Sequence, residues 1–212
     1  MSGHYFMYNK RLHDLTSKTI ADLENGYHQM FGQISDLHWK LSKQNGMAAS
    51  ALERNLSRHS GLMKQNAAVL LNFTDVLKSL MSTIEATDEG SSTMFTPTGR
   101  QEWQYALSSN VTTVQIKLDA AMMREAAVSF KSNLTYMDEV FSAFNTMINE
   151  VLAKVEIPWD DFSGMWSDAQ SMVRSVTEET QHHINALVED TELFVYELER
   201  VDRMLGRVNV GG

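Results

Sequence analysis

The chain has 212 residues, of which 43% are hydrophobic and 21% are charged, and it contains no cysteine. This is the composition of a packed soluble protein, and the missing thiols exclude disulfides, thiolate zinc sites and cysteine catalysis. The net charge of -9 argues against nucleic acid or anionic lipid as a partner, because the summed field repels phosphate. With 2 prolines and 11 glycines, the chain has too few turn residues for a many-stranded sandwich or barrel.

The first periodic segment predicts a helix over residues 10–42. Its apolar residues alternate at spacings of three and four, which is typical of a helix pressed against a partner helix. They are Ile20, Leu23, Tyr27, Met30, Ile34, Leu37 and Leu41. Gly26 and Gly32 interrupt this helix, so either they pack closely against another backbone or they are tolerated weak points. Asn45 and Gly46 suit a left-handed cap and predict a tight turn into an antiparallel second helix.

The second segment carries two polar residues on an otherwise apolar stripe. The stripe consists of Leu56, His59, Met63, Asn66, Leu70, Phe73, Leu77, Leu80 and Ile84. His59 and Asn66 either set the helix register as structural polar groups or act as a ligand or proton switch, and the sequence leaves both readings open. Residues 89–101 then have the polar, Gly- and Pro-containing composition of a linker.

The third segment, residues 102–156, gives the strongest helical signal. Twelve consecutive stripe positions from Ile116 to Val155 are apolar. Pro158 ends this helix because proline cannot continue the hydrogen-bond ladder, and a turn is expected up to Gly164. A fourth stripe then runs from Val173 to Leu205 and stops at Gly206.

These elements predict an all-α protein made of two long antiparallel helical hairpins, residues 1–88 and 102–212, which form an elongated four-helix bundle. The longest apolar block, residues 67–71, is far shorter than a bilayer span. The N-terminus lacks the basic and apolar regions of a secretory leader. We therefore expect neither a membrane span nor a cleaved signal peptide.

The sequence contains one metal-like spacing. Glu179 and His182 form a Glu-x-x-His motif, with Glu178 and His183 beside it. A di-iron bundle needs further Glu and His ligands on the other helices, and the first and third stripes contain none, so a solvated acidic face is the favoured interpretation. No nucleotide-binding or nucleophile motif occurs. The sequence thus predicts a non-enzymatic protein with no cofactor, no metal and no nucleic-acid partner.

Tryptophans cluster near the turns. Trp39 lies in the last turn of the first helix, whereas Trp159 and Trp166 flank the second turn. An indole in such a place either plugs the open end of a hairpin or offers an aromatic anchor to a partner.

The hairpins and their turn aromatics resemble the WXG-type (Trp-x-Gly) substrates of bacterial type VII secretion, as a divergent tandem of two hairpins. In the second half, the run from Phe162 to Ala169, with Gly164 and Trp166, is similar to the family's Trp-Ser-Gly-x-Ala turn. In the first half, Trp39 and Gly46 hold similar places. The resemblance implies a turn motif or partner contact at Trp39, Gly46, Trp159, Gly164 and Trp166.

The resemblance also implies a function. Such a protein is a secreted substrate, or an adaptor or targeting partner for a larger toxin, and it stays in the cytoplasm until export. Its partner is a second copy, a heterodimer partner or the toxin itself, bound through apolar helix flanks. The family's Tyr-x-x-x-Asp/Glu export signal does not occur, since Arg200 lies four places after Tyr196. Two alternatives from other classes are a soluble component related to helical-bundle pore-forming toxins and a ligand-sensing bundle or metal enzyme.

Overall fold

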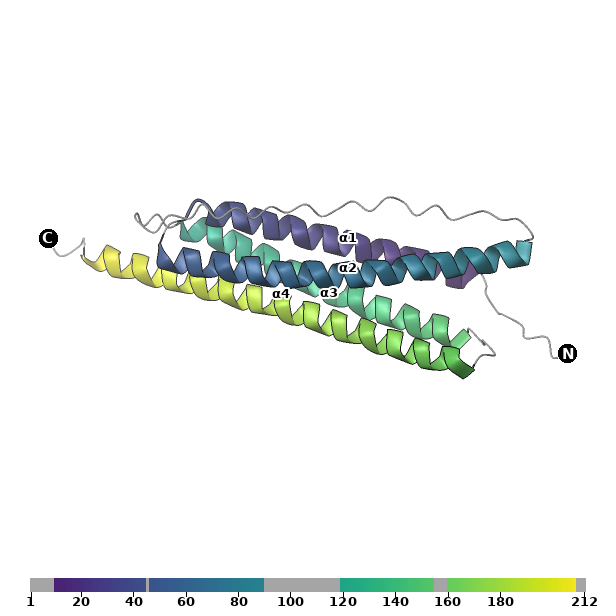
Figure 1. Ribbon diagram of the computed structural model, residues 1–212. Coiled ribbons are helices and arrows are strands. Elements are labelled where there is room, and N and C mark those ends of the chain that lie inside the picture. The colour runs from purple at the N-terminus through teal and green to yellow at the C-terminus, as the bar shows by residue number, and fades with distance from the viewer. Residues whose placement is uncertain (1–9, 45, 90–118, 155–159, 209–212) are drawn as a thin grey trace. The chain divides into compact units, whose positions relative to one another are not determined.

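A computed structural model describes residues 10–44, 46–89, 119–154 and 160–208 (Figure 1). It contains four helices, α1 (Lys10–Leu41), α2 (Met47–Glu89), α3 (Ala120–Lys154) and α4 (Asp160–Val208). These described residues contain no strand. The chain is therefore a four-helix bundle, and the predicted all-α fold is confirmed.

The helices are grouped into two compact units, and each helix contributes one stretch to each unit. Unit 1 comprises residues 1–27, 65–102 and 137–179, whereas unit 2 comprises residues 28–64, 103–136 and 180–212. Each unit thus has its own four-helix core. The predicted division into an N-terminal and a C-terminal hairpin follows the chain, whereas the compact units cut across both hairpins.

The predicted stripes form the cores of the units. All seven stripe positions of α1, from Ile20 to Leu41, are at most 1% exposed. Of the ten described stripe positions on α3, eight are buried, and only Ala120 and Leu134 are partly exposed. The α3 stripe supplies the large aromatic rings of Phe130, Phe141 and Phe144. Burial of such side chains is the main stabilising contribution to a bundle without disulfides or metals.

The third helix begins at Ala120, and its start is set by a capping side chain. Asp119 is not helical, and its Oδ1 accepts a hydrogen bond of 3.0 Å from the backbone N–H of Met122. This contact satisfies one of the amide groups that a helix N-terminus leaves unpaired. The predicted helix over residues 102–156 is therefore wrong at Asp119, where the carboxylate competes with the helix for backbone donors. Residues 102–118, with Ile116 and Trp103, lie outside the described part of the chain.

In unit 1, contacts between described residues join α1 with α2, α3 with α4, and α1 with α3. Lys78 on α2 forms an ion pair of 2.7 Å with Glu24 on α1. Asn145 on α3 donates a hydrogen bond of 3.4 Å to Thr177 on α4. Between α1 and α3, the rings of Tyr27 and Phe141 meet edge to face with their centroids 5.9 Å apart. Aromatic pairs prefer this geometry because the ring edge is positive and the ring face negative.

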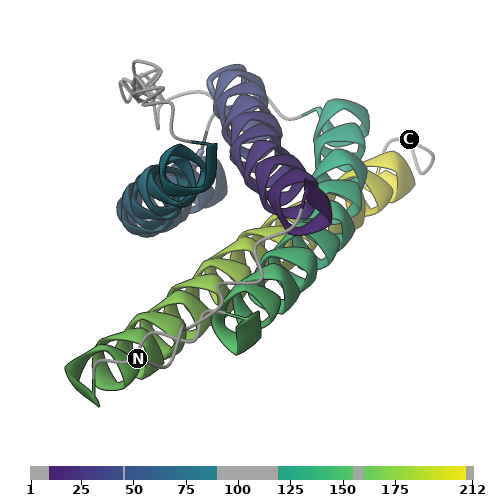
Figure 2. The same ribbon diagram turned by 90° about the vertical axis from the view of Figure 1, so that its right-hand side faces the viewer.

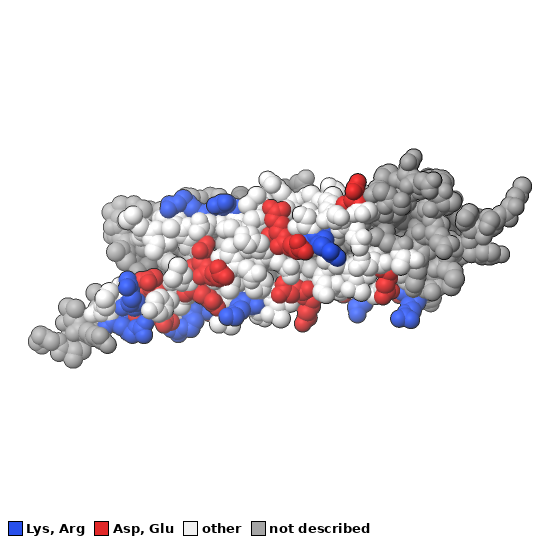
Figure 3. All heavy atoms as spheres, turned by 90° about the horizontal axis from the view of Figure 1, so that it is seen from below, with Lys and Arg blue, Asp and Glu red and all other residues white. Residues whose placement is uncertain are grey.

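Unit 2 has polar contacts around its whole ring of helices, in the order α1, α2, α4 and α3. Asn55 on α2 donates a hydrogen bond of 2.9 Å to Asp190 on α4. Lys131 on α3 pairs with Glu192 on α4 at 3.0 Å. The ribbons of α3 and α4 run side by side in both views (Figure 2). Where the chain's surface is drawn by charge, acidic and basic side chains are interspersed on the face that is shown (Figure 3).

The two glycines within α1 differ in their surroundings. A Cβ built on Gly26 would lie 2.9 Å from the Sδ of Met137 on α3, so this glycine permits a close approach between two helices of unit 1. A Cβ built on Gly32 meets nothing within 4 Å. Gly26 thus packs closely, but against a side chain instead of a backbone, and Gly32 is a weak point of the helix.

We expect Gly32→Ala to stabilise the protein by about 1 kcal/mol, because alanine restricts the unfolded chain and favours the helix without any steric conflict. Urea unfolding followed by circular dichroism measures this change. Gly26→Ala is the matched control, since its new methyl group must displace Met137 and should gain less. Equal effects of the two substitutions would show that the contact with Met137 is unimportant.

Candidate functional site

The turn between α1 and α2 is closed by local hydrogen bonds. The backbone N–H of Gln44 donates to the carbonyl of Leu41 at 2.8 Å, and the N–H of Ser42 donates to that of His38 at 2.9 Å. The hydroxyl of Ser42 donates to the carbonyl of Trp39 at 2.7 Å. These bonds satisfy carbonyl groups that the end of a helix leaves unpaired. The last turn of α1, which carries Trp39, is therefore held in a defined conformation.

Gly46 lies at the start of α2 and has a φ of 120°. Among the described residues it is the only glycine with a positive φ, a region that side-chain-bearing residues rarely adopt. Its carbonyl accepts the N–H of Ser50 at 3.1 Å, so Gly46 occupies the N-cap position of α2. The predicted left-handed glycine is present, but it precedes the second helix and does not end the first.

Trp39 lies on the surface of this turn. Its side chain is 55% exposed, and the ammonium group of Lys43 lies 5.2 Å from the ring centroid. Met47, the first residue of α2, is 84% exposed. The indole therefore does not plug the end of the hairpin. Of the two roles that the sequence allowed for Trp39, the exposed anchor agrees with its position.

The second turn differs from the expectation. α4 begins at Asp160, so Gly164 and Trp166 lie within the helix and not at its opening. The predicted turn up to Gly164 is therefore wrong after residue 159. Trp159 lies outside the described residues, and Trp166 is described only by its helical backbone.

Near the first turn, charged and polar side chains connect three helices of unit 2, and two of them, Lys40 and Glu53, are buried. His38 on α1 lies 3.5 Å from the carboxylate of Glu53 on α2, and Glu53 is 5% exposed. Lys40 lies 3.0 Å from Asp36 of its own helix and 3.8 Å from Glu125 on α3. A buried carboxylate is tolerated only where charged or hydrogen-bonding partners compensate for its lost hydration. The polar cluster thus fixes the end of α1 relative to its neighbours in this unit.

A pair of histidines joins α2 and α4 in the same unit. The Nδ1 atoms of His59 and His183 are 3.0 Å apart, and the ring centroids are separated by 5.1 Å. One ring must donate its N–H and the other must accept, so the contact requires at least one neutral imidazole. The sequence marked His59 on its stripe and His183 beside the Glu-x-x-His motif, but it could not pair them, because the register between α2 and α4 depends on the assembled bundle.

Three further ionisable groups, Arg58, His182 and Asp190, lie near this pair. Burial lowers the pKa of His59 below its ordinary value, and the neighbouring His183, Arg58 and His182 lower it further, whereas the carboxylate of Asp190 raises it.

Asn66, the second polar residue on the α2 stripe, belongs to unit 1 and is 9% exposed. Its amide nitrogen has no hydrogen-bond partner among the described residues.

The pair does not extend to a metal site. No group of three or more His, Cys, Asp or Glu side chains is placed to hold an ion within the described ranges. Likewise, none of the described helices has the length and apolar character needed to cross a bilayer. Comparison of the chain with protein-family models, curated proteins and solved structures finds no match.

Acidification should destabilise the protein through His59. Because its pKa is lower in the folded chain than in the unfolded one, the unfolded chain binds the proton more readily. At pH values above about 6.5, the pKa of a histidine in the unfolded chain, His59 is neutral in both states and its full contribution to stability is present. This contribution decreases as the pH falls below that value. We expect the free energy of unfolding to drop between pH 7.5 and 5.5, and His59→Asn to reduce this drop.

Urea unfolding at a series of pH values measures the effect. His28→Gln serves as the control, because His28 is an exposed histidine of unit 2 outside the His59–His183 pair. An identical pH profile for wild type and His59→Asn would contradict the assignment.

Proposed function

We propose that the protein is a non-enzymatic helical component of a type VII secretion system, acting as a secreted substrate or as an adaptor for a larger toxin. The observation that carries this proposal is the exposed Trp39 at the α1–α2 turn, where the resembled family has its signature aromatic residue. Met47 adds a second exposed apolar side chain to the same turn.

The exposure of Trp39 is not the result of a poorly formed core. All seven stripe positions of α1 are buried, including Leu37 and Leu41 on either side of the indole. Tryptophan is among the residues that contribute most to binding at protein interfaces. The Ser42 hydroxyl bonds the backbone carbonyl of Trp39, and the ammonium of Lys43 lies near the indole ring.

Further apolar side chains on α3 and α4 of unit 2 support docking along helix flanks. Val128 is 65% exposed, Leu193 is 60% exposed and Tyr196 is 55% exposed. Helices recognise other helices through such side chains at spacings of three and four. Leu193 and Tyr196 have this spacing on α4.

The missing Tyr-x-x-x-Asp/Glu motif favours the adaptor role over independent export. Arg200 occupies the position at which the motif after Tyr196 would need an acid, and it pairs with Glu197 at 2.9 Å. In this proposal the bound partner carries the export signal and the two proteins leave the cell together.

Deletion of the secretion ATPase from the producing strain should abolish the appearance of this protein in the culture medium. Immunoblots of cells and supernatants, with a cytoplasmic protein as the lysis control, measure the distribution. Equal amounts in the medium with and without the ATPase would refute the proposed function.

Trp39→Ala should weaken the complex with the co-exported partner while leaving the fold intact. Because the indole is mostly exposed, we expect the free energy of unfolding to change by about 0.5 kcal/mol or less. Loss of a tryptophan anchor should weaken the complex by about 2 kcal/mol, which a pull-down against the purified partner detects.

Val76→Ala is the matched control for this substitution, because Val76 is 60% exposed and lies on α2, outside the α1–α2 turn. It should leave the complex unchanged. Full partner binding by Trp39→Ala would show that the α1–α2 turn is not part of the interface.

A further inference from the structure

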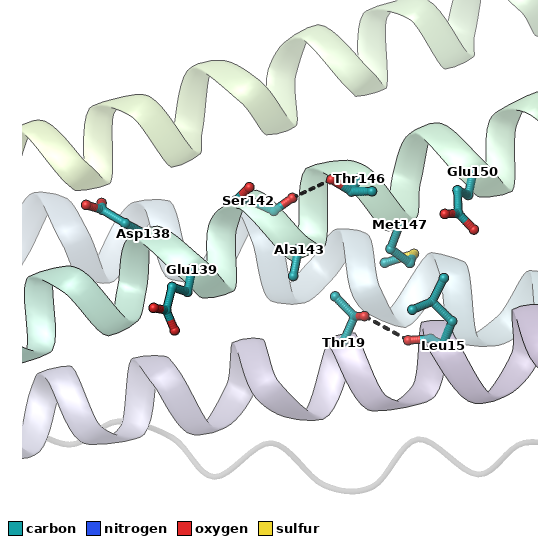
Figure 4. A pocket seen from close by; sticks show the side chains of 9 residues that line it. All are labelled: Leu15, Thr19, Asp138, Glu139, Ser142, Ala143, Thr146, Met147 and Glu150. Atoms are coloured by element: carbon teal, nitrogen blue, oxygen red, sulfur yellow. Dashed lines mark hydrogen bonds between the residues drawn. The ribbon is translucent and has the colours of Figure 1, made fainter.

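A groove lies between α1 and α3 in unit 1 (Figure 4). It has a volume of about 580 Å³ and opens to solvent. Ala143 lies at its centre, exposed and with only a methyl group, between the larger side chains one turn away on either side of it on α3. The small side chain at this position is the local cause of the hollow.

The floor of the groove is apolar. Met147 is fully buried beneath it, and Leu15 faces it from α1. Two threonines also line the groove, but their hydroxyls are bonded within their own helices. Thr19 donates to the carbonyl of Leu15 at 2.8 Å, and Thr146 donates to that of Ser142 at 2.9 Å. With these hydroxyls satisfied, the floor suits aliphatic side chains and offers no polar group that requires a partner.

The rim of the groove is acidic. Asp138, Glu139 and Glu150 line it, and no lysine or arginine is among its described lining residues. In the part of the chain that the structure describes, neither Glu139 nor Glu150 forms an ion pair. These two carboxylates are eleven residues apart on α3, which corresponds to about 16 Å along the helix, or three turns. The charge is therefore spread along the length over which a docked helix would lie.

We propose that this groove binds one amphipathic, lysine- or arginine-rich α-helix of another protein. Aliphatic side chains of that helix rest on the floor around Ala143 and Met147, and its basic side chains pair with the carboxylates of Glu139 and Glu150. An apolar hollow alone would accept many helices, and the acidic rim selects the basic ones. This inference rests on the proposed role as a docking protein and names the chemistry of the partner.

A synthetic helical peptide of leucine and lysine at helical spacing is the probe, and a leucine–glutamate peptide of the same pattern is its control. Fluorescence anisotropy with the purified full chain measures binding. We expect the basic peptide to bind about tenfold or more tightly than the acidic one, and added salt to weaken it. Failure of the basic peptide to bind at millimolar concentration would overturn the proposal.

Variants locate the binding site. Ala143→Gln fills the groove from an exposed helical position and should weaken binding about tenfold. The double variant Glu139→Gln with Glu150→Gln should weaken it about fivefold, as expected for the loss of two exposed ion pairs.

The double variant Glu178→Gln with Glu189→Gln is the matched control. Both residues are exposed acids on α4, so the net charge changes by the same amount outside the groove. Equal weakening by the two double variants would show binding to general negative charge and overturn the proposal.

Sedimentation of the peptide-free chain tests a different occupant. A dimer that dissociates on Ala143→Gln would assign the groove to a second copy of the chain and overturn the proposal. These measurements use purified protein, so they are independent of the export experiment. Peptide binding without export would refute the secretion role alone, and export without peptide binding would refute the groove alone.

Discussion

The structure depends on the mutual burial of four apolar helix stripes. A single helix of this chain has polar residues on most of its surface and one apolar stripe, which water does not solvate favourably. Burying the stripe requires neighbouring helices, and in each unit stretches of all four helices provide them. Because the chain has no cysteine, disulfides contribute nothing to its stability. Packing of the stripes therefore accounts for most of the stability, and every other feature is arranged around it.

Periodicity was sufficient to predict the helices and their inward faces. The stripe of α1 is buried at every position. Apolar residues at spacings of three and four lie on one face of a helix, and that face is stable only when it packs against another helix. Helix ends were predicted less well. The third stripe continues on both sides of Asp119, and the apolar pattern does not reveal that this carboxylate caps a helix. Gly164 was expected in a turn, yet α4 already begins at Asp160, so Gly164 lies within the helix.

The candidate sites were harder to predict, for a different reason. Trp39 and Gly46 were identified from local sequence, since each acts through its own position in a turn. The pairing of His59 with His183 depends on the register between α2 and α4, and the groove depends on a small residue on α3 lying opposite α1. Both arise from residues far apart in the chain. No local pattern contains this information, because it exists only once the helices are packed.

One contact beneath the first turn has a consequence for the chain topology. The side-chain oxygen of Gln44 accepts a hydrogen bond of 2.7 Å from the backbone N–H of Asp119, so the last turn residue after α1 touches the residue that precedes α3. The polypeptide leaves this place, builds α2 and its connection, and returns to it 75 residues later. The end of α1 and the start of α3 are therefore adjacent in space, although α2 lies between them in the sequence. Joining Gln44 directly to Asp119 would therefore separate α2 and its connection from the chain while leaving α1 and α3 adjacent at this junction.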